Sequence, residues 1–376
     1  MTARFYIGLM SGTSADGIDL ALVSFSHGKP QVHAAYFQAY SDVIRDKITS
    51  LYLPSNNEID RAFALDIELA QCFAQAINDF IEQQQLNSTD IIAIGCHGQT
   101  IRHRPTQPHA FTLQIGCNQT LATLTDIAVI GDFRTKDIAL GGQGAPLVPA
   151  FHHACFAEKD HDVFVVNIGG IANISFLPAN HDLEDKSQVI GFDTGPGNAL
   201  LDEWYAKYHQ GRYDENGAWA ATGNIDKLLL AQLLQNEYFH KKAPKSTGRE
   251  EFNSAWLNEH LSNNDRIENL SANDIQATLT ALTASSIELA IKDLATKGKI
   301  YICGGGIHNK TLIKQLDESL PTFEFHLTEK QNICSDSLEA TAFAWLAYAF
   351  EKNIFGNIPA VTGACKETVL GIRFDP

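Results

Sequence analysis

The chain has 376 residues, of which 44% are hydrophobic and 19% charged, so it is long enough to fold into two globular domains with separate cores. Its 28 lysine and arginine residues against 44 aspartate and glutamate residues give a formal net charge of −16. A field of this sign repels nucleic acids and anionic membranes, so we expect neither as a partner. An anionic small molecule would need local donors, for which Arg102, Arg104 and Arg134 are candidates.

The cellular compartment is predicted from what the sequence lacks. No apolar run approaches the roughly 18 residues of a membrane-spanning helix, and the first residues lack the apolar core and cleavage site of a secretory signal. The seven cysteines are scattered singly, without a Cys-x-x-Cys pair, which suits reduced thiols and disfavours a zinc ribbon. We therefore expect a cytoplasmic protein.

The first half of the chain begins with a predicted β-hairpin. Residues 5–9 and 18–25 are apolar runs on either side of "MSGTSADGID" (residues 10–19). Residues 58–85 then predict a long amphipathic helix, and residues 90–101, "DIIAIGCHGQTI", predict a buried strand that runs into a glycine turn. The apolar stripe of the helix consists of Ile59, Phe63, Ile67, Ala70, Phe73, Ile77 and Phe80.

The second half repeats this order of elements. Residues 162–177, "DVFVVNIGGIANISFL", predict a strand, a glycine turn and a second strand. A long helix follows, capped by Ser271 or Asn273 and ended by Gly298, and residues 300–303 then form another buried strand that ends in glycines. The repetition predicts an α/β fold of two duplicated domains, 1–158 and 159–376, although a Rossmann-like sheet has a similar alternation.

Two of the glycine turns are candidate phosphate sites. The stretch "MSGTSADGID" lacks the Gly-Lys-Ser/Thr ending of a Walker A loop, and a plain hairpin turn would explain its glycines. The hydroxyl residues beside Gly12 favour phosphate binding, because closely spaced amides and hydroxyls suit phosphate oxygens. The stretch "NIGGIAN" (residues 167–173) is the counterpart in the second half, although paired glycines also mark a β-bulge.

Two further stretches are candidates for a base and a nucleoside site. Asp193 lies in "GFDTGPGN", where three small residues follow it; an aspartate in a turn is commonly a turn former, but this small-residue run predicts close approach by another group, so Asp193 is a candidate general base. The stretch "CGGGIHN" (residues 303–309) has three consecutive glycines, which would let a purine ring approach the backbone. A tight strand-to-helix connection would need only one.

The remaining polar candidates lie at strand ends and at a helix start. His97 by itself is typical of a satisfied turn histidine, and Glu339 is typical of a first-turn acid in a helix capped by Ser335 or Ser337. The complete group is His97, Gln99, Asp132, Arg134, Gln143 and Glu339.

Taken in order, the motifs resemble the anhydro-N-acetylmuramic acid kinase family, which has the hexokinase, actin and Hsp70 superfold. The matching stretches are "GLMSGTSADGID", "GCHGQT", "GDFR", "GGQGAPLVP", "NIGGIANIS", "FDTGPGN" and "CGGGIHN", which span nearly the whole chain. Each glycine turn alone is unspecific, but the ordered set is highly specific. The resemblance implies two duplicated ribonuclease H-like (actin-like ATPase) domains with a cleft between them.

The resemblance also implies a reaction. ATP, water and 1,6-anhydro-N-acetylmuramic acid would give N-acetylmuramic acid 6-phosphate and ADP, a step in the recycling of peptidoglycan. Asp193 would be the base that activates the water, and Mg²⁺ is expected with ATP, held through waters or by Asp16 or Asp193. A homodimer is also implied, and closure of the two domains over the sugar would exclude bulk water.

The implied binding residues fall into two sets. ATP would be bound by Gly12, Thr13, Ser14, Ala15, Asp16, Gly17, Ile18, Asp19, Asn167, Gly169, Gly170, Gly304, Gly305 and Gly306, and the sugar by His97, Gln99, Arg134 and Glu339. Kinases of this superfold commonly carry an aspartate just before the first phosphate turn, where this chain has Gly8, Leu9 and Met10, so the metal ligands stay open.

Three other functions share some of these features. A kinase of the same superfold that acts on another sugar or small acid would need the same nucleotide residues. A non-catalytic actin-like nucleotide-binding protein would have no need for Asp193 beside a substrate pocket. A glycoside hydrolase with two carboxylates would leave the phosphate-type turns without a role.

Overall fold

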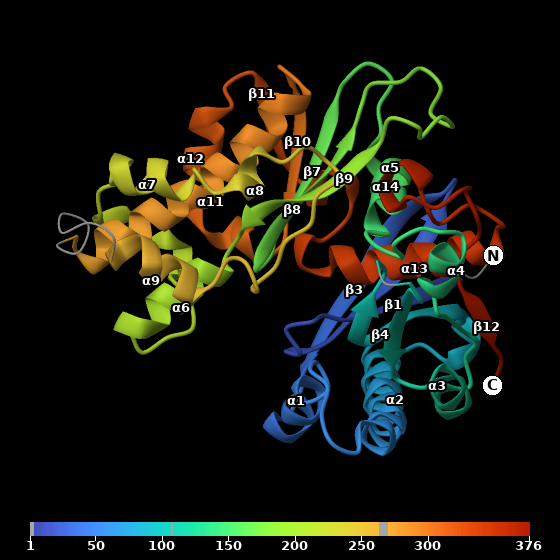
Figure 1. Cartoon of the computed structure of the whole chain (residues 1–376). Coiled ribbons are helices and arrows are strands. Elements are labelled where there is room, and N and C mark those ends of the chain that lie inside the picture. The colour runs from blue at the N-terminus through green and yellow to red at the C-terminus, as the bar shows by residue number, and fades with distance from the viewer. Residues whose placement is uncertain (1–3, 107, 263–269) are drawn as a thin grey trace. The chain divides into compact units, whose positions relative to one another are not determined.

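A computed structural model describes residues 4–106, 108–262 and 270–376 (Figure 1). The chain divides into two compact units. Unit 1 comprises Met1–Cys155 together with Gln331–Pro376, and unit 2 comprises Phe156–Lys330. We describe each unit by itself.

Unit 1 is built on a seven-stranded sheet with the order β12-β6-β4-β1-β2-β3, in which β5 also pairs with β4. Strand β1 is parallel to β4 and antiparallel to β2, and β4 is parallel to β6. The strands are β1 Phe5–Ser11, β2 Gly17–Ser26, β3 Lys29–Ala39, β4 Ile91–Arg104, β5 Phe111–Ile115, β6 Val129–Gly131 and β12 Ile372–Phe374.

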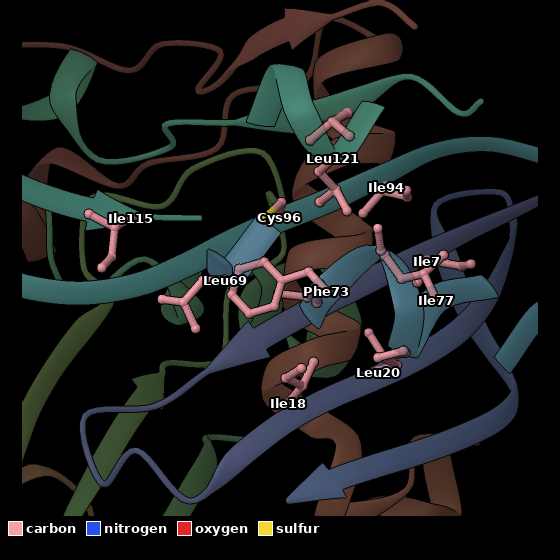
Figure 2. Close-up of a cluster of buried hydrophobic side chains, with 14 of the residues drawn as sticks. Ile7, Ile18, Leu20, Leu69, Phe73, Ile77, Ile94, Cys96, Ile115 and Leu121 are labelled. Carbon is pink, nitrogen blue, oxygen red and sulfur yellow. The ribbon is translucent and has the colours of Figure 1, made fainter. Parts of the chain in front are cut away.

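The helices of unit 1 include the long α2 and the C-terminal α13. A buried apolar cluster joins α2 and α3 to the sheet, with Phe73, Ile77 and Leu121 packed against Ile7, Ile94 and other strand residues (Figure 2). The helices are α1 Asp42–Thr49, α2 Glu58–Gln83, α3 Asn118–Thr125, α4 Thr135–Ala139, α5 Val148–Phe156, α13 Leu338–Glu351 and α14 Pro359–Thr362, with short 3₁₀ turns η1 Ser88–Asp90 and η6 Ser335–Ser337.

Helix α13 packs directly on the backbones of β1 and β4. A Cβ atom at Gly8 would lie 1.7 Å from the carbonyl oxygen of Ala340, and one at Gly95 would lie 2.0 Å from that of Phe343. Only glycine permits this approach. The expected division at residue 158, which assigned the chain end to the second domain, is therefore wrong for residues 331–376: they belong to unit 1, where β12 also pairs with β6.

The expected apolar stripe of α2 is only half correct. Phe73, Ile77 and Phe80 are buried as predicted, but Ile59 and Phe63 are 75% and 71% exposed. In the first half of the helix the buried positions are instead Ala62, Leu65 and Leu69. The helical spacing of apolar residues predicted a helix but not which side of it is buried, because the first half of α2 carries two apolar stripes.

Unit 2 is built on a five-stranded sheet with the order β11-β10-β7-β8-β9. Its strands are β7 Val163–Ile168, β8 Ile171–Leu177, β9 Ile190–Pro196, β10 Gly298–Cys303 and β11 Phe323–Leu327. Its helices are α6 Ala199–Tyr208, α7 Lys227–Leu233, α8 Glu237–His240, α9 Ser254–Ser262, α11 Ala272–Leu294 and α12 Lys310–Ser319, with 3₁₀ turns η2 Glu215–Gly217, η3 Ala220–Thr222, η4 Gly305–His308 and η5 Thr328–Gln331.

The two sheets repeat one five-stranded pattern. In unit 1 the order β6-β4-β1-β2-β3 has the first three strands parallel and the last three joined as an antiparallel meander, and β11-β10-β7-β8-β9 in unit 2 has the same directions. The predicted duplication is confirmed. A Rossmann-like sheet is excluded, because its strands would be mostly parallel.

Two local predictions need correction. Strand β4 runs on through "GCHG" to Arg104, with Gly98 at φ 73° inside it, so no glycine turn ends the strand. Helix α11 is capped by Ser271 as expected, but it ends at Leu294, and Gly298 instead begins β10. Separately, among the residues that the structure describes, no helix combines the length and the apolar character needed to cross a membrane.

The contact between α13 and β1 predicts a specific stability effect. Gly8→Ala would force a methyl group into the Ala340 carbonyl, and we expect a loss of about 3 kcal/mol in the free energy of unfolding. Gly12→Ala is the control, because its nearest neighbour would be 3.6 Å away and its stability should change by less than about 0.5 kcal/mol. Urea denaturation measures both; equal midpoints for the two variants would contradict this account.

Candidate functional site

The first candidate phosphate turn joins β1 to β2. Ala15 donates its N–H to the Gly12 carbonyl at 3.1 Å and has a left-handed backbone with φ 53°. The amides of Thr13 and Ser14 donate to no group among the described residues, and both side chains are exposed. The turn therefore presents amides and hydroxyls to solvent, as an anion site requires.

Only part of the predicted ATP segment faces solvent. Gly17, Ile18 and Asp19 already belong to β2, and a Cβ at Gly17 would lie 2.3 Å from the Gln38 carbonyl, so this glycine serves the pairing with β3. Ala15 and Ile18 are fully buried. The exposed residues of the segment are thus Thr13, Ser14 and Asp16, while Gly12 and Asp19 are half-buried.

Gln99 holds this turn in place through hydrogen bonds. Ser11 Oγ donates to Gln99 Oε1 at 2.6 Å, and Gln99 Nε2 donates to the Gly12 carbonyl at 3.1 Å. Tyr52 donates its hydroxyl to the Thr13 carbonyl at 2.8 Å and lies 3.3 Å from Gln99 Nε2. Gln99 is fully buried and its amide is engaged with the protein. Its geometry fits a residue that shapes the turn better than one that contacts the sugar.

His97, Arg134 and Glu339 come together in unit 1. Arg134 Nε and Nη2 lie 3.1 and 2.9 Å from His97 Nε2, and Arg134 Nη1 donates to the Gly144 carbonyl at 2.7 Å. A guanidinium can only donate, so His97 Nε2 accepts and the imidazole proton is on Nδ1. Asp137 holds the loop of Gly144 in turn, since its Oδ2 accepts the Gly144 N–H at 2.8 Å.

The charges of this cluster are set by burial. Burial, reinforced by the Arg134 charge, lowers the pKa of His97 to about 3, so the ring is neutral. Burial lowers the pKa of Arg134 to about 10, against an opposing effect of Glu339, and the guanidinium stays cationic at pH 7. Burial raises the pKa of Glu339, and Arg134 opposes that rise. His97 also lines a cavity of about 220 Å³ with Asn118, Asp132 and Thr135.

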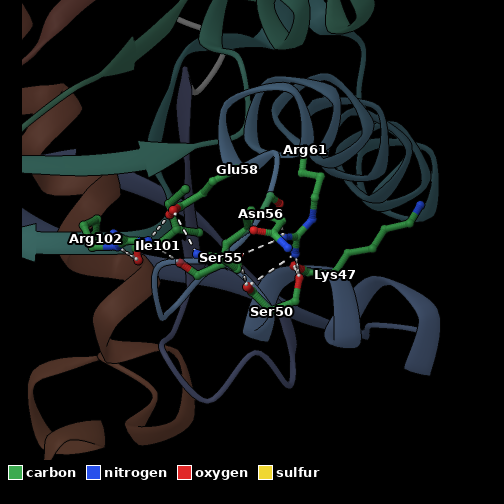
Figure 3. A network of polar contacts seen from close by, with 9 residues as sticks. Lys47, Ser50, Ser55, Asn56, Glu58, Arg61, Ile101 and Arg102 are labelled. Atoms are coloured by element: carbon green, nitrogen blue, oxygen red, sulfur yellow. Dashed lines mark hydrogen bonds and ion pairs between the residues drawn. The ribbon is translucent and has the colours of Figure 1, made fainter.

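Arg102, another arginine candidate of unit 1, is less available. Arg102 pairs with Glu58 and donates to the Leu51 carbonyl at 3.0 Å, in a polar network that also contains Arg61 and Ser50 (Figure 3). This network ties the start of α2 to β4. Arg102 therefore has a structural partner, which leaves Arg134 as the better candidate for binding an anion.

The second candidate phosphate turn, at Gly169 and Gly170 in unit 2, is held in place by hydrogen bonds to its carbonyl groups. The Gly170 carbonyl accepts from the amides of Gly197 and Ala199 at 2.9 and 3.1 Å, and the Gly169 carbonyl accepts from the Asn198 amide at 2.8 Å. The amides of Gly169 and Gly170 themselves donate to no described group. The turn is held rigidly while its donors stay available.

Asp193 lies in strand β9 and not in a turn. The pairing of β8 with β9 shifts register between Ala172 and Asn173, so Asp193 sits beside a β-bulge. Its Oδ2 accepts from Ser246 Oγ at 2.9 Å and from the Thr247 amide at 3.1 Å, while Oδ1 has no hydrogen bond to a described group. Burial raises the pKa of Asp193, and the two hydrogen bonds oppose that rise.

The small residues after Asp193 are explained by contacts within the protein and not by the approach of another group, as the sequence had predicted. A Cβ at Gly195 would lie 2.7 Å from the Phe239 ring, and one at Gly197 would lie 2.3 Å from the Gly169 carbonyl. The close approach that the sequence predicted is made by the protein's own chain. Gly197 allows the close contact with the turn at Gly169, Gly195 makes room for Phe239, and neither glycine by itself indicates a ligand.

The triple glycine is likewise mostly a packing feature. A Cβ at Gly304 would lie 2.2 Å from Asn167 Oδ1, and one at Gly306 would lie 2.3 Å from Ile168 Cγ2. Only Gly305 is exposed, and it lines a cavity of about 480 Å³, which is large enough for a nucleoside. The cavity is lined by Asn198, Leu201, Asp202, Tyr213, Asp214, Glu215, Asn216, Gly305, His308 and Asn309.

Sequence analysis missed two groups of residues. Asp202 lines the large cavity, and burial raises its pKa to about 7, against an opposing effect of Arg249. Residues 245–249, "KSTGR", contact Asp193 and Gly170. The signal available was only a run of polar residues around one glycine, which is typical of any loop. In the described part of the chain, no three His, Cys, Asp or Glu side chains cluster as a preformed metal site.

The repeated sheets define a class: a duplicated α/β protein with the fold of the hexokinase, actin and Hsp70 superfold. The family model described as anhydro-N-acetylmuramic acid kinase matches residues 4–376. The chain belongs to this family.

Individual relatives agree with this assignment. The anhydro-N-acetylmuramic acid kinase of Colwellia psychrerythraea is 56% identical over 99% of this chain and 98% of its own length. That of Saccharophagus degradans is 47% identical over the full length of both. A looser likeness, with a TM-score of 0.40 and 13% identity, covers 93% of this chain and 95% of an activator of 2-hydroxyisocaproyl-CoA dehydratase from Clostridium difficile with bound ADPNP. The fold assignment rests on the strand orders.

The contact between His97 and Arg134 predicts an unusual titration. We expect the His97 ring to stay neutral, with its proton on Nδ1, down to about pH 4, because burial and the Arg134 charge both disfavour the imidazolium. Ring ¹⁵N chemical shifts in NMR measure this directly. A His97 ring that protonates near pH 6 would contradict the prediction.

Proposed function

We propose that the protein uses ATP and water to convert 1,6-anhydro-N-acetylmuramic acid into N-acetylmuramic acid 6-phosphate and ADP. Family membership over residues 4–376 supports the reaction. The observation that carries the mechanism is Asp193, a largely buried carboxylate with one oxygen held by Ser246 and Thr247 and the other unengaged. This is the arrangement a positioned general base needs.

The nucleotide would be bound mainly by backbone. The cavity beside Gly305 takes the adenosine, and the amides of Gly169 and Gly170 and of residues 12–14 bind phosphate oxygens. Phosphoryl transfer depends mainly on positioning and on stabilisation of charge, which fixed amides provide. Mg²⁺ prefers carboxylate, phosphate and water oxygens. It would be held through waters, by the exposed carboxylate of Asp16 or by Asp193, and it would neutralise phosphate charge.

Asp193 Oδ1 would accept a proton from the attacking water. The water oxygen then bonds to C1 of the sugar while the bond between C1 and O6 breaks. The released O6 bonds to the γ-phosphorus of ATP, and the bond from that phosphorus to the bridging oxygen of ADP breaks. The proton on Asp193 returns to solvent with the products.

The sugar would be bound in unit 1. Arg134 is cationic and is aimed by His97 and the Gly144 carbonyl, so it suits the lactyl carboxylate of the substrate or the transferring phosphoryl group. Glu339 would accept from a sugar hydroxyl. His97, being neutral, acts by holding Arg134 and not by proton transfer. We further propose a cytoplasmic homodimer, as the family resemblance implies.

The reaction is tested by ADP release from ATP with 1,6-anhydro-N-acetylmuramic acid, compared with N-acetylmuramic acid and glucose. We expect turnover with the anhydro sugar alone, and a loss of about 10²–10⁴-fold in kcat for Asp193→Asn with ATP binding retained. Asp160→Asn, which removes an exposed carboxylate of the same unit, is the matched control and should keep wild-type kcat. Turnover of an ordinary sugar instead would support a different kinase of this superfold.

The raised pKa of Asp193 predicts a pH dependence. The base must be ionised, so kcat should fall as pH decreases through the Asp193 pKa, and this fall should lie above the ordinary range of an aspartate because burial disfavours the carboxylate. The pH profile of kcat from pH 4 to pH 9 measures it. An acid limb at or below the usual aspartate range of about 4 would remove Asp193 as the base.

A further inference from the structure

The Arg249 guanidinium lies beside the second candidate phosphate turn. A Cβ atom built on Gly170 would lie 3.7 Å from Nη2 of Arg249 and 3.8 Å from Cβ of Ala199, which are its nearest described neighbours outside residues 169–171. The amides of Gly169 and Gly170 donate to no described group. The Arg249 cation and two available N–H donors thus lie close together in unit 2.

The charge of Arg249 opposes the rise in the pKa of Asp202, but the two side chains form no ion pair. Its side chain is exposed, and no carboxylate of the described residues forms an ion pair with it. Other cations near proposed functional residues already have partners: Arg134 donates to His97, and Lys245 donates to the carbonyls of Tyr238 and Phe239 at 3.0 and 3.2 Å. Arg249 is therefore the cation that remains available beside the glycine turn.

The segment that carries Arg249 also holds the base. The Asp193 amide donates to the Lys245 carbonyl at 3.2 Å, and Ser246 and Thr247 both donate to Asp193 Oδ2. Thr247 Oγ1 donates to Glu251 at 2.8 Å, which fixes the segment on the far side of Arg249. Residues 245–251 are thus anchored on both sides of Arg249, so its backbone is held beside Asp193 and Gly170.

We propose that Arg249 is a catalytic residue whose guanidinium binds the γ-phosphoryl oxygens of ATP at Gly169 and Gly170 during transfer. The inference rests on the proposed function. As the bond to the bridging oxygen of ADP breaks and the bond to the sugar O6 forms, negative charge spreads over the phosphoryl oxygens and the bridging oxygen. Arg249 stabilises that charge by donating hydrogen bonds and keeps its own protons throughout.

Steady-state kinetics of the full chain test the proposal. We expect Arg249→Ala to lower kcat for the anhydro sugar by about 10³-fold while its KM changes by less than about threefold, because the interaction belongs to the transition state. Arg249→Lys keeps the charge but loses the planar fork, so its kcat should lie in between. Lys242→Ala, which removes one exposed charge from the same loop, is the matched control and should leave kcat unchanged.

Two readouts separate a catalytic from a structural role. Millimolar guanidinium should restore part of the kcat of Arg249→Ala and none of that of Asp193→Asn. The thermal midpoint of Arg249→Ala should equal that of the wild type, because the side chain is exposed. A kcat within threefold of the wild type, or a loss of kcat that follows a lowered thermal midpoint and is not rescued, would overturn the proposal.

A sugar-independent measurement distinguishes this proposal from the proposed function. ADP with Mg²⁺ and aluminium fluoride mimics the transferring phosphoryl group, and the wild type should bind this mimic more tightly than ADP alone. Arg249→Ala should lose that gain and keep its affinity for ADP. If the wild type fails to turn over the anhydro sugar but this difference appears, the substrate assignment fails and the role of Arg249 stands. If Arg249→Ala binds the mimic more tightly than ADP by the same factor as the wild type, the proposed role of Arg249 is overturned.

Discussion

The contact between α13 and the strands β1 and β4 determines much of unit 1. Gly8 and Gly95 let the carbonyls of Ala340 and Phe343 approach where any side chain would collide. Ala340 follows Glu339 directly, so this contact sets where Glu339 lies. Strand β1 leads into the turn at residues 12–16, and β4 carries His97 and Gln99 just beyond Gly95. One close approach thus fixes the candidate sugar-binding residues and the first phosphate turn relative to one another.

In unit 2, too, a glycine permits a close backbone contact that positions candidate functional groups. A backbone turn that binds phosphate must keep its amides available and yet be rigid. In the candidate turn of unit 2, rigidity comes from hydrogen bonds to the carbonyls of Gly169 and Gly170. Gly197 has no side chain, so the start of α6 can reach those carbonyls. The proposed base, Asp193, is held by similar means, since hydrogen bonds join its backbone and one carboxylate oxygen to residues 245–247. Preorganisation of this kind lowers the cost of reorganisation during reaction.

The distribution of charge is consistent with a kinase and less so with a passive nucleotide-binding protein. The chain has a net charge of −16, so an ATP-binding site must offset a repulsive field locally. Arg134 and Arg249 supply cations in unit 1 and unit 2, while Arg102 is paired with Glu58. A neutral His97 adds no charge of its own and serves to aim Arg134. A passive nucleotide-binding protein would have no need of a held carboxylate such as Asp193.

The sequence by itself determined the two hairpins, the duplicated order of elements, the family, and Asp193 as a candidate base, because periodicity and ordered motifs are local properties of the chain. It did not show which glycines face a ligand. Gly195, Gly197, Gly304 and Gly306 turned out to make room for the protein's own atoms, and only packing reveals which atoms occupy that space. The return of residues 331–376 to unit 1 and the approach of Arg249 to Gly170 were also decided by tertiary structure alone, since both join segments that are far apart in sequence.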